Sequence, residues 1–277
     1  MNARALLGCG LGAALLAWGC AAPPPMPSAP PGPTSADLTA AELARVGGLD
    51  RLHARGVIEL RTNDETGEHF DQGDLDLRWS RTLGLAASLS KLGDRWVWIG
   101  ADATQWWIFE LKSKPTRLHT GMLTSARSGL APAFPWLMGV RPLLPAPSAE
   151  PERTNDRCRV RVQLPPGVLP AGAALFADFD AKTSLPVATE LTLPGGGVWR
   201  SSLTDWMSVE TAGVAQGAWP RVPRRALATN GTDDRRTTVR VSLDTARADA
   251  EATDRPTLYD LAGLRERFAP QEVETEE

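Results

Sequence analysis

The side chains that could perform acid–base or metal chemistry are few and scattered along this sequence. The three histidines are His53, His69 and His119, and none has a second ligand residue at the spacing typical of a zinc site. His69 lies near Asp71 and Asp74 in a polar stretch, which is more typical of a solvated turn than of a metal site. The sequence therefore predicts neither a metal site nor a bound cofactor.

Carboxylates and glycines give no stronger indication of catalysis. Asp74 and Asp76 are two residues apart, but they alternate with Leu75 and Leu77, which is typical of the wet face of a strand rather than of a catalytic pair. No nucleophile-elbow motif is present, and Gly195–Gly197 is better explained by a hairpin than by a phosphate-binding loop. We therefore expect this chain not to be an enzyme.

Cysteine chemistry points to the N-terminus. Residues 1–20 combine one early positive charge, Arg4, with an apolar run over residues 5–18, as in a secretory signal peptide. The run ends in LAWGC, which resembles the cleavage signal of bacterial lipoproteins. Cleavage before Cys20 would leave its thiol to carry a diacylglycerol. The alternative is an ordinary secretory signal that contains a cysteine, while Cys9 lies too early to have an apolar run before it.

The residues after Cys20 favour a tether. Residues 23–33 hold seven prolines, which favour extended polyproline II and bury no core. The only free thiol left after processing, Cys158, lies in an alternating strand pattern and is better explained as a small core residue than as a nucleophile. The formal charge of −3 gives no basic footprint for nucleic acid. We predict a signal peptide (residues 1–19), a lipidated cysteine and tether (20–36), a globular domain (37–269) and a disordered acidic tail (270–277).

The globular part has the periodicity of a mainly β domain with a few helices. An amphipathic helix is expected over residues 36–53, interrupted by its two glycines, and period-2 alternation follows from residue 57. About a dozen strands, consecutive and mostly antiparallel, continue to residue 244. Segment 132–139 is expected to be a short helical turn, and segment 258–268 a short closing helix or an extended docking segment.

Tryptophan is the one residue type in excess, with ten in the chain against one tyrosine. Strands 95–99 and 105–111 are apolar on both faces, whereas an antiparallel strand usually has one wet face. The N-terminal helix could cover one face; the other needs more protein or a bound apolar ligand. Segment 132–139 is apolar enough to dock on the concave face of the sheet or, alternatively, to dip into a membrane.

The order of these elements resembles the LolA/LolB-like family of periplasmic lipoprotein carriers and outer-membrane lipoprotein receptors. The likeness is carried by ARGVIELR (54–61), GDLDLRW (73–79), LGLAASLSKLGDRWVWIGAD (83–102), QWWIFEL (105–111) and LPVATELTLPGGGVWRSSLTDW (185–206). It implies an unclosed antiparallel β half-barrel whose concave face is covered by helices and holds acyl chains. The residues expected to line that cavity are Leu75, Leu77, Trp79, Trp96, Trp98, Trp107, Phe109, Trp136 and Met138.

The resemblance and the predicted anchor together favour the receptor branch. For the exposed hydrophobic loop of such a receptor, Phe134, Trp136, Leu137 and Met138 are the candidates. We expect a monomer that faces the periplasm and is held to a membrane, the outer rather than the inner, by lipid on Cys20. It would bind a lipid or the acyl chains of lipoproteins without catalysis. The alternative is a structural or assembly lipoprotein that acts through protein contacts and has no ligand.

Overall fold

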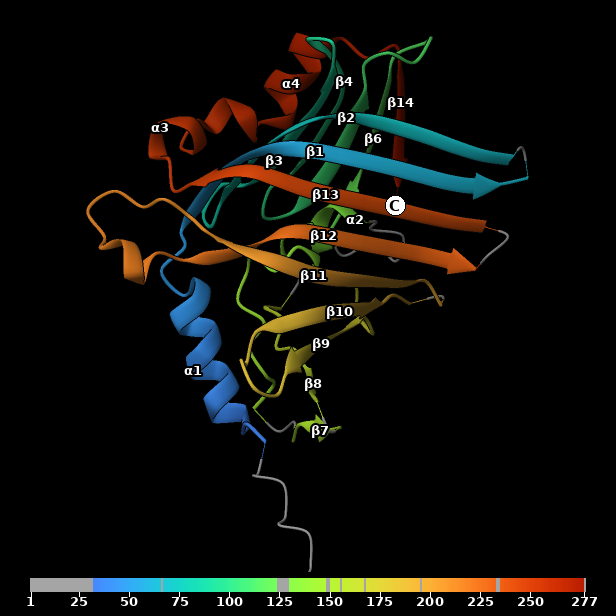
Figure 1. Cartoon of the computed structure of the whole chain (residues 1–277). Coiled ribbons are helices and arrows are strands. Elements are labelled where there is room, and N and C mark those ends of the chain that lie inside the picture. The colour runs from blue at the N-terminus through green and yellow to red at the C-terminus, as the bar shows by residue number, and fades with distance from the viewer. Residues whose placement is uncertain are drawn as a thin grey trace, which may run out of the picture. The chain divides into compact units, whose positions relative to one another are not determined.

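A single sheet of 14 strands dominates the chain (Figure 1). The computed structural model describes residues 32–276, except residues 66, 124–129, 148–149, 155, 167, 195 and 233–234. The predicted signal peptide, Cys20 and most of the tether therefore lie outside the described residues. Residues 32–277 form one compact unit.

The sheet is built from hairpins, and its two halves meet where the first strand pairs with the thirteenth. Neighbouring strands follow the order β14-β6-β5-β4-β3-β2-β1-β13-β12-β11-β10-β9-β8-β7, and every pair is antiparallel except β14 with β6. The first half contains β1 (Arg51–Asp64), β2 (Gly67–Ser80), β3 (Gly84–Lys91), β4 (Asp94–Ala101), β5 (Gln105–Glu110) and β6 (Arg117–Met122). The second contains β7 (Glu152–Arg153), β8 (Arg157–Arg161), β9 (Ala174–Asp180), β10 (Pro186–Thr192), β11 (Val198–Ser208), β12 (Arg221–Thr232), β13 (Arg235–Arg247) and β14 (Glu272–Glu276).

Short helices lie on both faces of the sheet. They are α1 (Ser35–Val46), α2 (Leu130–Leu137), α3 (Ala250–Thr253) and α4 (Leu261–Phe268), with 3-10 turns η1 (Gln216–Ala218) and η2 (Pro256–Leu258). Helix α1 begins at a capping box, in which Thr34 accepts from the Asp37 amide and the Asp37 carboxylate accepts from the Thr34 amide. It ends at Val46, so the two glycines end the helix instead of only interrupting a helix over residues 36–53, and Leu49 and Leu52 belong to the turn and to β1.

The sheet curls around α2. Helix α2 contacts β4 and β5 in one half of the sheet and β10 in the other. Seven neighbour steps separate β4 from β10 in the sheet order, which in a flat sheet would be roughly 34 Å at about 4.8 Å per step. An eight-residue helix is only about 12 Å long. The sheet is therefore strongly curved and unclosed, which confirms the predicted half-barrel.

Two regions differ from the sequence-based expectation. The polar stretch after residue 62 was expected to be a long turn, but β1 and β2 continue through it and pair as far as Asp64 with Gly67. The predicted disordered tail is instead strand β14, which runs parallel to β6. Its acidic side chains meet basic partners there: Glu272 lies 2.9 Å from Arg117 and Glu274 lies 3.1 Å from His119.

Candidate functional site

The candidate site is the inner face of the half-barrel, defined as the face that α2 contacts. Leu75, Leu77 and Trp79 of β2 project into this face and are almost fully buried. They belong to one continuous apolar cluster that also contains Trp136 and Met138 from the α2 region. Five of the nine residues that the sequence singled out are thus brought together.

The other four residues do not join them. Trp98, Trp107 and Phe109 lie in a second apolar cluster, on the outer face, with Tyr259 and Leu264 of the C-terminal segment. Phe268 of α4 contacts two of these rings, with centroids 5.9 Å from Trp98 and 5.1 Å from Phe109. The outer faces of β4 and β5, which are apolar like the inner ones, are therefore covered by another part of the same chain. That cover is α4 rather than the N-terminal helix.

The reason for this division is a β-bulge in β4. Lys91 pairs with Asp94 and Ser90 with Arg95, but Leu89 pairs with Val97, so Trp96 is an extra residue. Because alternate residues of a strand face opposite sides, one extra residue exchanges the two faces beyond it. Trp98 is consequently turned to the outer face. Trp96 itself is half-buried, with the Lys91 ammonium 4.6 Å from its ring centroid.

Helix α2 and the segment after it fill the inner face. Phe134 and Leu137 of α2, together with Met138, lie against β12 and β13, and the space left between them is only about 10 Å³. Ser201 of β11 donates a hydrogen bond of 2.9 Å to the Leu137 carbonyl at the end of the helix. Gly139 then turns the chain with φ +61°, where a Cβ would lie 3.2 Å from Leu203. This docking agrees with the predicted helical segment on the concave face.

A buried ion pair in α1 ties this cover to the sheet. Glu42 and Arg45 are paired at 2.6 Å and almost completely buried. Arg45 donates to the Gly139 carbonyl at 2.8 Å and to the Arg221 carbonyl of β12 at 2.9 Å. Glu42 in turn accepts from the Leu143 amide at 2.8 Å. One pair therefore holds α1, β12 and the segment after α2 together.

The candidate exposed loop is not exposed. Trp136, Leu137 and Met138 are each at most 4% exposed and Phe134 is half-buried, because α2 packs into the half-barrel. The most exposed large apolar residue described is instead Leu92, at 98%, in the tight turn between β3 and β4. Its φ of +53° is a conformation in which glycine or asparagine is usual. The sequence contains a signal for this exposed turn, a leucine followed by glycine between two alternating strands. The leucine was interpreted instead as part of the strand pattern.

A small hollow opens beside α2, between the helix and the end of β2–β4. Its volume is about 180 Å³, and Trp79, Leu85, Trp136 and Arg141 are among its lining residues. The Arg141 guanidinium lies 4.6 Å from the Trp136 ring centroid and 5.6 Å from that of Trp79. This hollow adjoins the inner face, and the Arg141 guanidinium places a positive charge beside that face.

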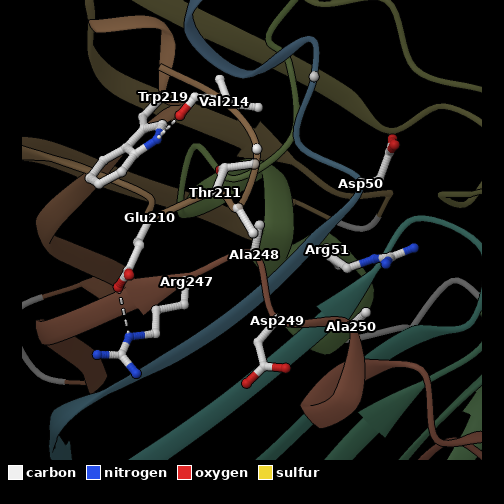
Figure 2. Close-up of a pocket in the computed structure, with 13 residues that line it drawn as sticks. Asp50, Arg51, Glu210, Thr211, Val214, Trp219, Arg247, Ala248, Asp249 and Ala250 are labelled. Carbon is white, nitrogen blue, oxygen red and sulfur yellow. Dashed lines mark hydrogen bonds and ion pairs between the residues drawn. The ribbon is translucent and has the colours of Figure 1, made fainter. Parts of the chain in front are cut away.

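A larger hollow lies elsewhere, where the α1–β1 connection, the β11–β12 loop and the start of α3 meet. Its volume is about 820 Å³, and Figure 2 shows five charged residues among those that line it, Asp50, Arg51, Glu210, Arg247 and Asp249. Glu210 and Arg247 face each other there at 3.0 Å, and Trp219 donates to the Val214 carbonyl. Arg51 is paired with Asp254 at 3.2 Å. These polar side chains of the hollow thus have their partners within the chain.

Chemically reactive groups do not converge on any of these hollows. No cluster of three histidines, cysteines or acids that could hold a metal ion is found among residues 32–276 as described. His53 contacts Asp76 at 3.2 Å, and His119 lies between Glu110 and Glu274. Cys158 is buried, and burial raises the pKa of its thiol, so it is held in the unreactive protonated form.

The architecture is that of an unclosed antiparallel half-barrel, and solved structures with the same fold are found. A DUF1329 family protein from Desulfovibrio piger matches with a TM-score of 0.50 and 9% identity, over 83% of this chain and 97% of that one. A LolA superfamily protein from Nitrosomonas europaea has a TM-score of 0.47 and 10% identity, over 77% and 93% of the two chains. An outer membrane lipoprotein-sorting protein domain from Vibrio parahaemolyticus has a TM-score of 0.45 and 11% identity, over 76% and 90%.

The fold is thus the unclosed half-barrel that the sequence resemblance implied. No protein-family model matches the sequence, and no curated protein matches it. Among the described residues, no helix has the length and apolar character needed to cross a bilayer.

Proposed function

We propose that this chain is an envelope lipoprotein that holds a lipid, or the acyl chains of a lipoprotein, against the inner face of the half-barrel. The observation that carries the proposal is the nature of the cover. A continuous apolar face that spans several strands is covered by helices α1 and α2 and the segment after α2 rather than by a second sheet, and α2 is only eight residues long. Such a cover and an acyl chain would compete for the same surface.

Displacement of α2 is energetically feasible. Each methylene removed from water contributes about 0.8 kcal/mol, so a chain of ten buried methylenes contributes roughly 8 kcal/mol. Against this stand the apolar contacts of α2 itself and a few hydrogen bonds, each of about 1 kcal/mol, such as that from Ser201 to Leu137. A ligand that replaces the apolar contacts of α2 with its own therefore offsets the free energy that is lost when α2 leaves the sheet.

The membrane side of the proposal rests on Cys20 and Leu92. Lipid on Cys20 would keep the chain at the membrane, with the proline-rich tether between the bilayer and α1. Leu92, fully exposed at the tip of a rigid hairpin, provides an apolar contact that could enter the interface of a bilayer or meet an incoming acyl chain. We assign to Leu92 the part that the sequence resemblance suggested for Phe134, Trp136, Leu137 and Met138.

Ligand capture tests the proposal directly. Residues 32–277, which keep the cap of α1, would be purified without detergent and analysed by native mass spectrometry, before and after incubation with a fatty acid. A mass increase of one acyl chain, lost when Met138 and Ala226 are both changed to tryptophan to fill the inner face, is expected. Absence of any co-purifying or added lipid would contradict it.

A second function is favoured by one specific observation, the residual space of only about 10 Å³ under α2. A half-barrel filled by its own side chains could serve as a structural or assembly lipoprotein that binds another protein. Crosslinking in intact envelopes separates the two: a stoichiometric protein partner together with no lipid uptake supports this alternative.

A further inference from the structure

Arg141 is the one cation beside the inner face for which the described residues offer no anion. It lies just after α2, and its Nε atom is buried without a hydrogen-bond partner in the described part of the chain. Two indole rings, Trp136 and Trp79, flank its guanidinium. An arginine carries five donors, and rings satisfy none of them fully.

The other charges of the same hollow are already engaged. Asp102 accepts from the Thr104 amide at 2.7 Å and from the Gln105 amide at 2.9 Å, within its own turn. Arg81 is 3.1 Å from Asp50 and donates to the carbonyls of Gly47 and Leu49. Burial and the nearby charge of Arg81 both lower the pKa of Arg141, so its surroundings disfavour the cation.

A half-buried cation with a buried, unpaired Nε and no counter-ion is costly, and a bound oxyanion would reduce that cost. A guanidinium binds carboxylates and phosphates through two parallel hydrogen bonds, which suits a flat, ring-flanked site. The hollow, about 180 Å³, accommodates such a head group but not an acyl chain. The acyl chain would have to continue onto the inner face, which begins at Trp79 and Trp136.

We propose that Arg141 binds the anionic head of a single amphiphile, a carboxylate or phosphate, whose acyl chain continues from this hollow onto the inner face. This inference rests on the proposed function and narrows the class of ligand to anionic amphiphiles. The acylated N-terminus of a lipoprotein carries neutral thioether, ester and amide groups, so it offers no oxyanion at this point. The preferred ligand is then an anionic lipid rather than a lipoprotein.

Photocrosslinking of the full-length chain in phosphatidylcholine nanodiscs tests the inference. The probes are a diazirine fatty acid, the fatty alcohol of the same chain, and the matching lysophosphatidic acid and monoacylglycerol; labelling is read by intact mass. One charge-assisted bidentate contact predicts labelling by each anionic probe at about tenfold lower concentration than by its neutral partner. The probe pair with the larger ratio identifies carboxylate or phosphate as the head.

The variants separate a binding role from a structural one. Arg141→Met keeps most of the stem and should abolish the anionic preference while leaving the neutral probes unchanged, and Arg141→Lys should restore part of it. Arg224→Met removes an exposed arginine of β12 outside the hollow and should leave both ratios as in the wild type. Equal labelling by anionic and neutral probes in the wild type, or an equal loss of both in Arg141→Met, overturns the inference while the lipid-binding function stands. Labelling by no probe overturns both.

Discussion

Tyr259, the only tyrosine of the chain, shows how the outer face is closed at the level of a single residue. Its ring is buried in the outer cluster, and its hydroxyl donates to the Thr253 carbonyl at 3.0 Å. Burial raises the pKa of Tyr259 to about 12. The hydroxyl therefore stays protonated in the folded protein at a pH where an exposed tyrosine ionises.

The raised pKa of Tyr259 predicts a loss of stability in alkali. Between pH 10.0 and about 12 the unfolded chain releases the tyrosine proton while the folded chain retains it, so the free energy of unfolding should fall, by roughly 2 kcal/mol. The titration of the single tyrosinate absorbance should have its midpoint near pH 12. A midpoint near 10 would show that Tyr259 is exposed. Tyr259→Phe should lack this part of the pH dependence.

Leu92 allows a prediction in which stability and function change independently. Leu92→Asn places a residue that tolerates positive φ at an exposed turn, so the melting temperature should be unchanged or slightly higher. Association with vesicles, measured by flotation, should decrease. Leu43→Gln is the control, since it removes another exposed leucine, on α1. An equal decrease in both variants would contradict a specific role for Leu92.

The division of the tryptophans shows how far single residues could be assigned from the sequence. Alternation predicts correctly that Leu75, Leu77 and Trp79 share the inner face. It fails for Trp98 because the bulge at Trp96 leaves no reliable mark in an uninterrupted apolar run. Trp107 and Phe109 face the same side of the sheet as Trp98, because β5 pairs with β4 in regular register.

At the scale of elements, α1 and α2 depend on each other through the Glu42–Arg45 pair. The two residues are one helical turn apart in α1, yet they contact segments almost 100 and 180 residues away in sequence. The sequence predicts α1 and α2 as helices from their patterns, but not this link. An acid and a base three residues apart normally indicate a solvated helix face, and only the tertiary fold buries them.

Breaking this pair on one side should destabilise the protein strongly. Arg45→Met leaves the Glu42 carboxylate buried and unpaired, so the free energy of unfolding should fall by about 3–5 kcal/mol. Glu42→Leu with Arg45→Met should cost less than Arg45→Met alone, because no charge is then left unpaired. Urea denaturation of both variants and of Glu42→Leu completes the double-mutant cycle. Additive losses would mean that the pair is not coupled.

At the scale of the whole molecule, the chain covers each face of its sheet with a different segment. Helices α1 and α2 cover the inner face, and the C-terminal segment from Tyr259 to Phe268 covers the outer one. The half-barrel, the strand order and the helical insert were predictable because most strands pair with a neighbour in sequence. Strand β14 was not, because its parallel pairing with β6 joins residues more than 150 positions apart.

The proposed lipid anchor is also tested at the scale of the whole molecule. Palmitate supplied to the producing bacterium should label the wild-type chain, and Cys20→Ala should remain unlabelled and leave the membrane fraction. Cys158→Ala is the matched control: its buried thiol should not influence labelling. Label retained in Cys20→Ala would show that the N-terminal segment is not a lipoprotein signal.

The pairing of β1 with β13 has a consequence for the order in which the protein can be completed. His53 pairs with Arg247, and Trp98 and Trp107 pack against residues after 255. A chain that emerges from its N-terminus can pair β1 to β6 with one another, but the free edges of β1 and β6 and the outer faces of β4 and β5 wait for β13, β14 and α4. The two halves of the sheet can therefore be joined, and the outer cluster closed, only when almost the last residue has been released.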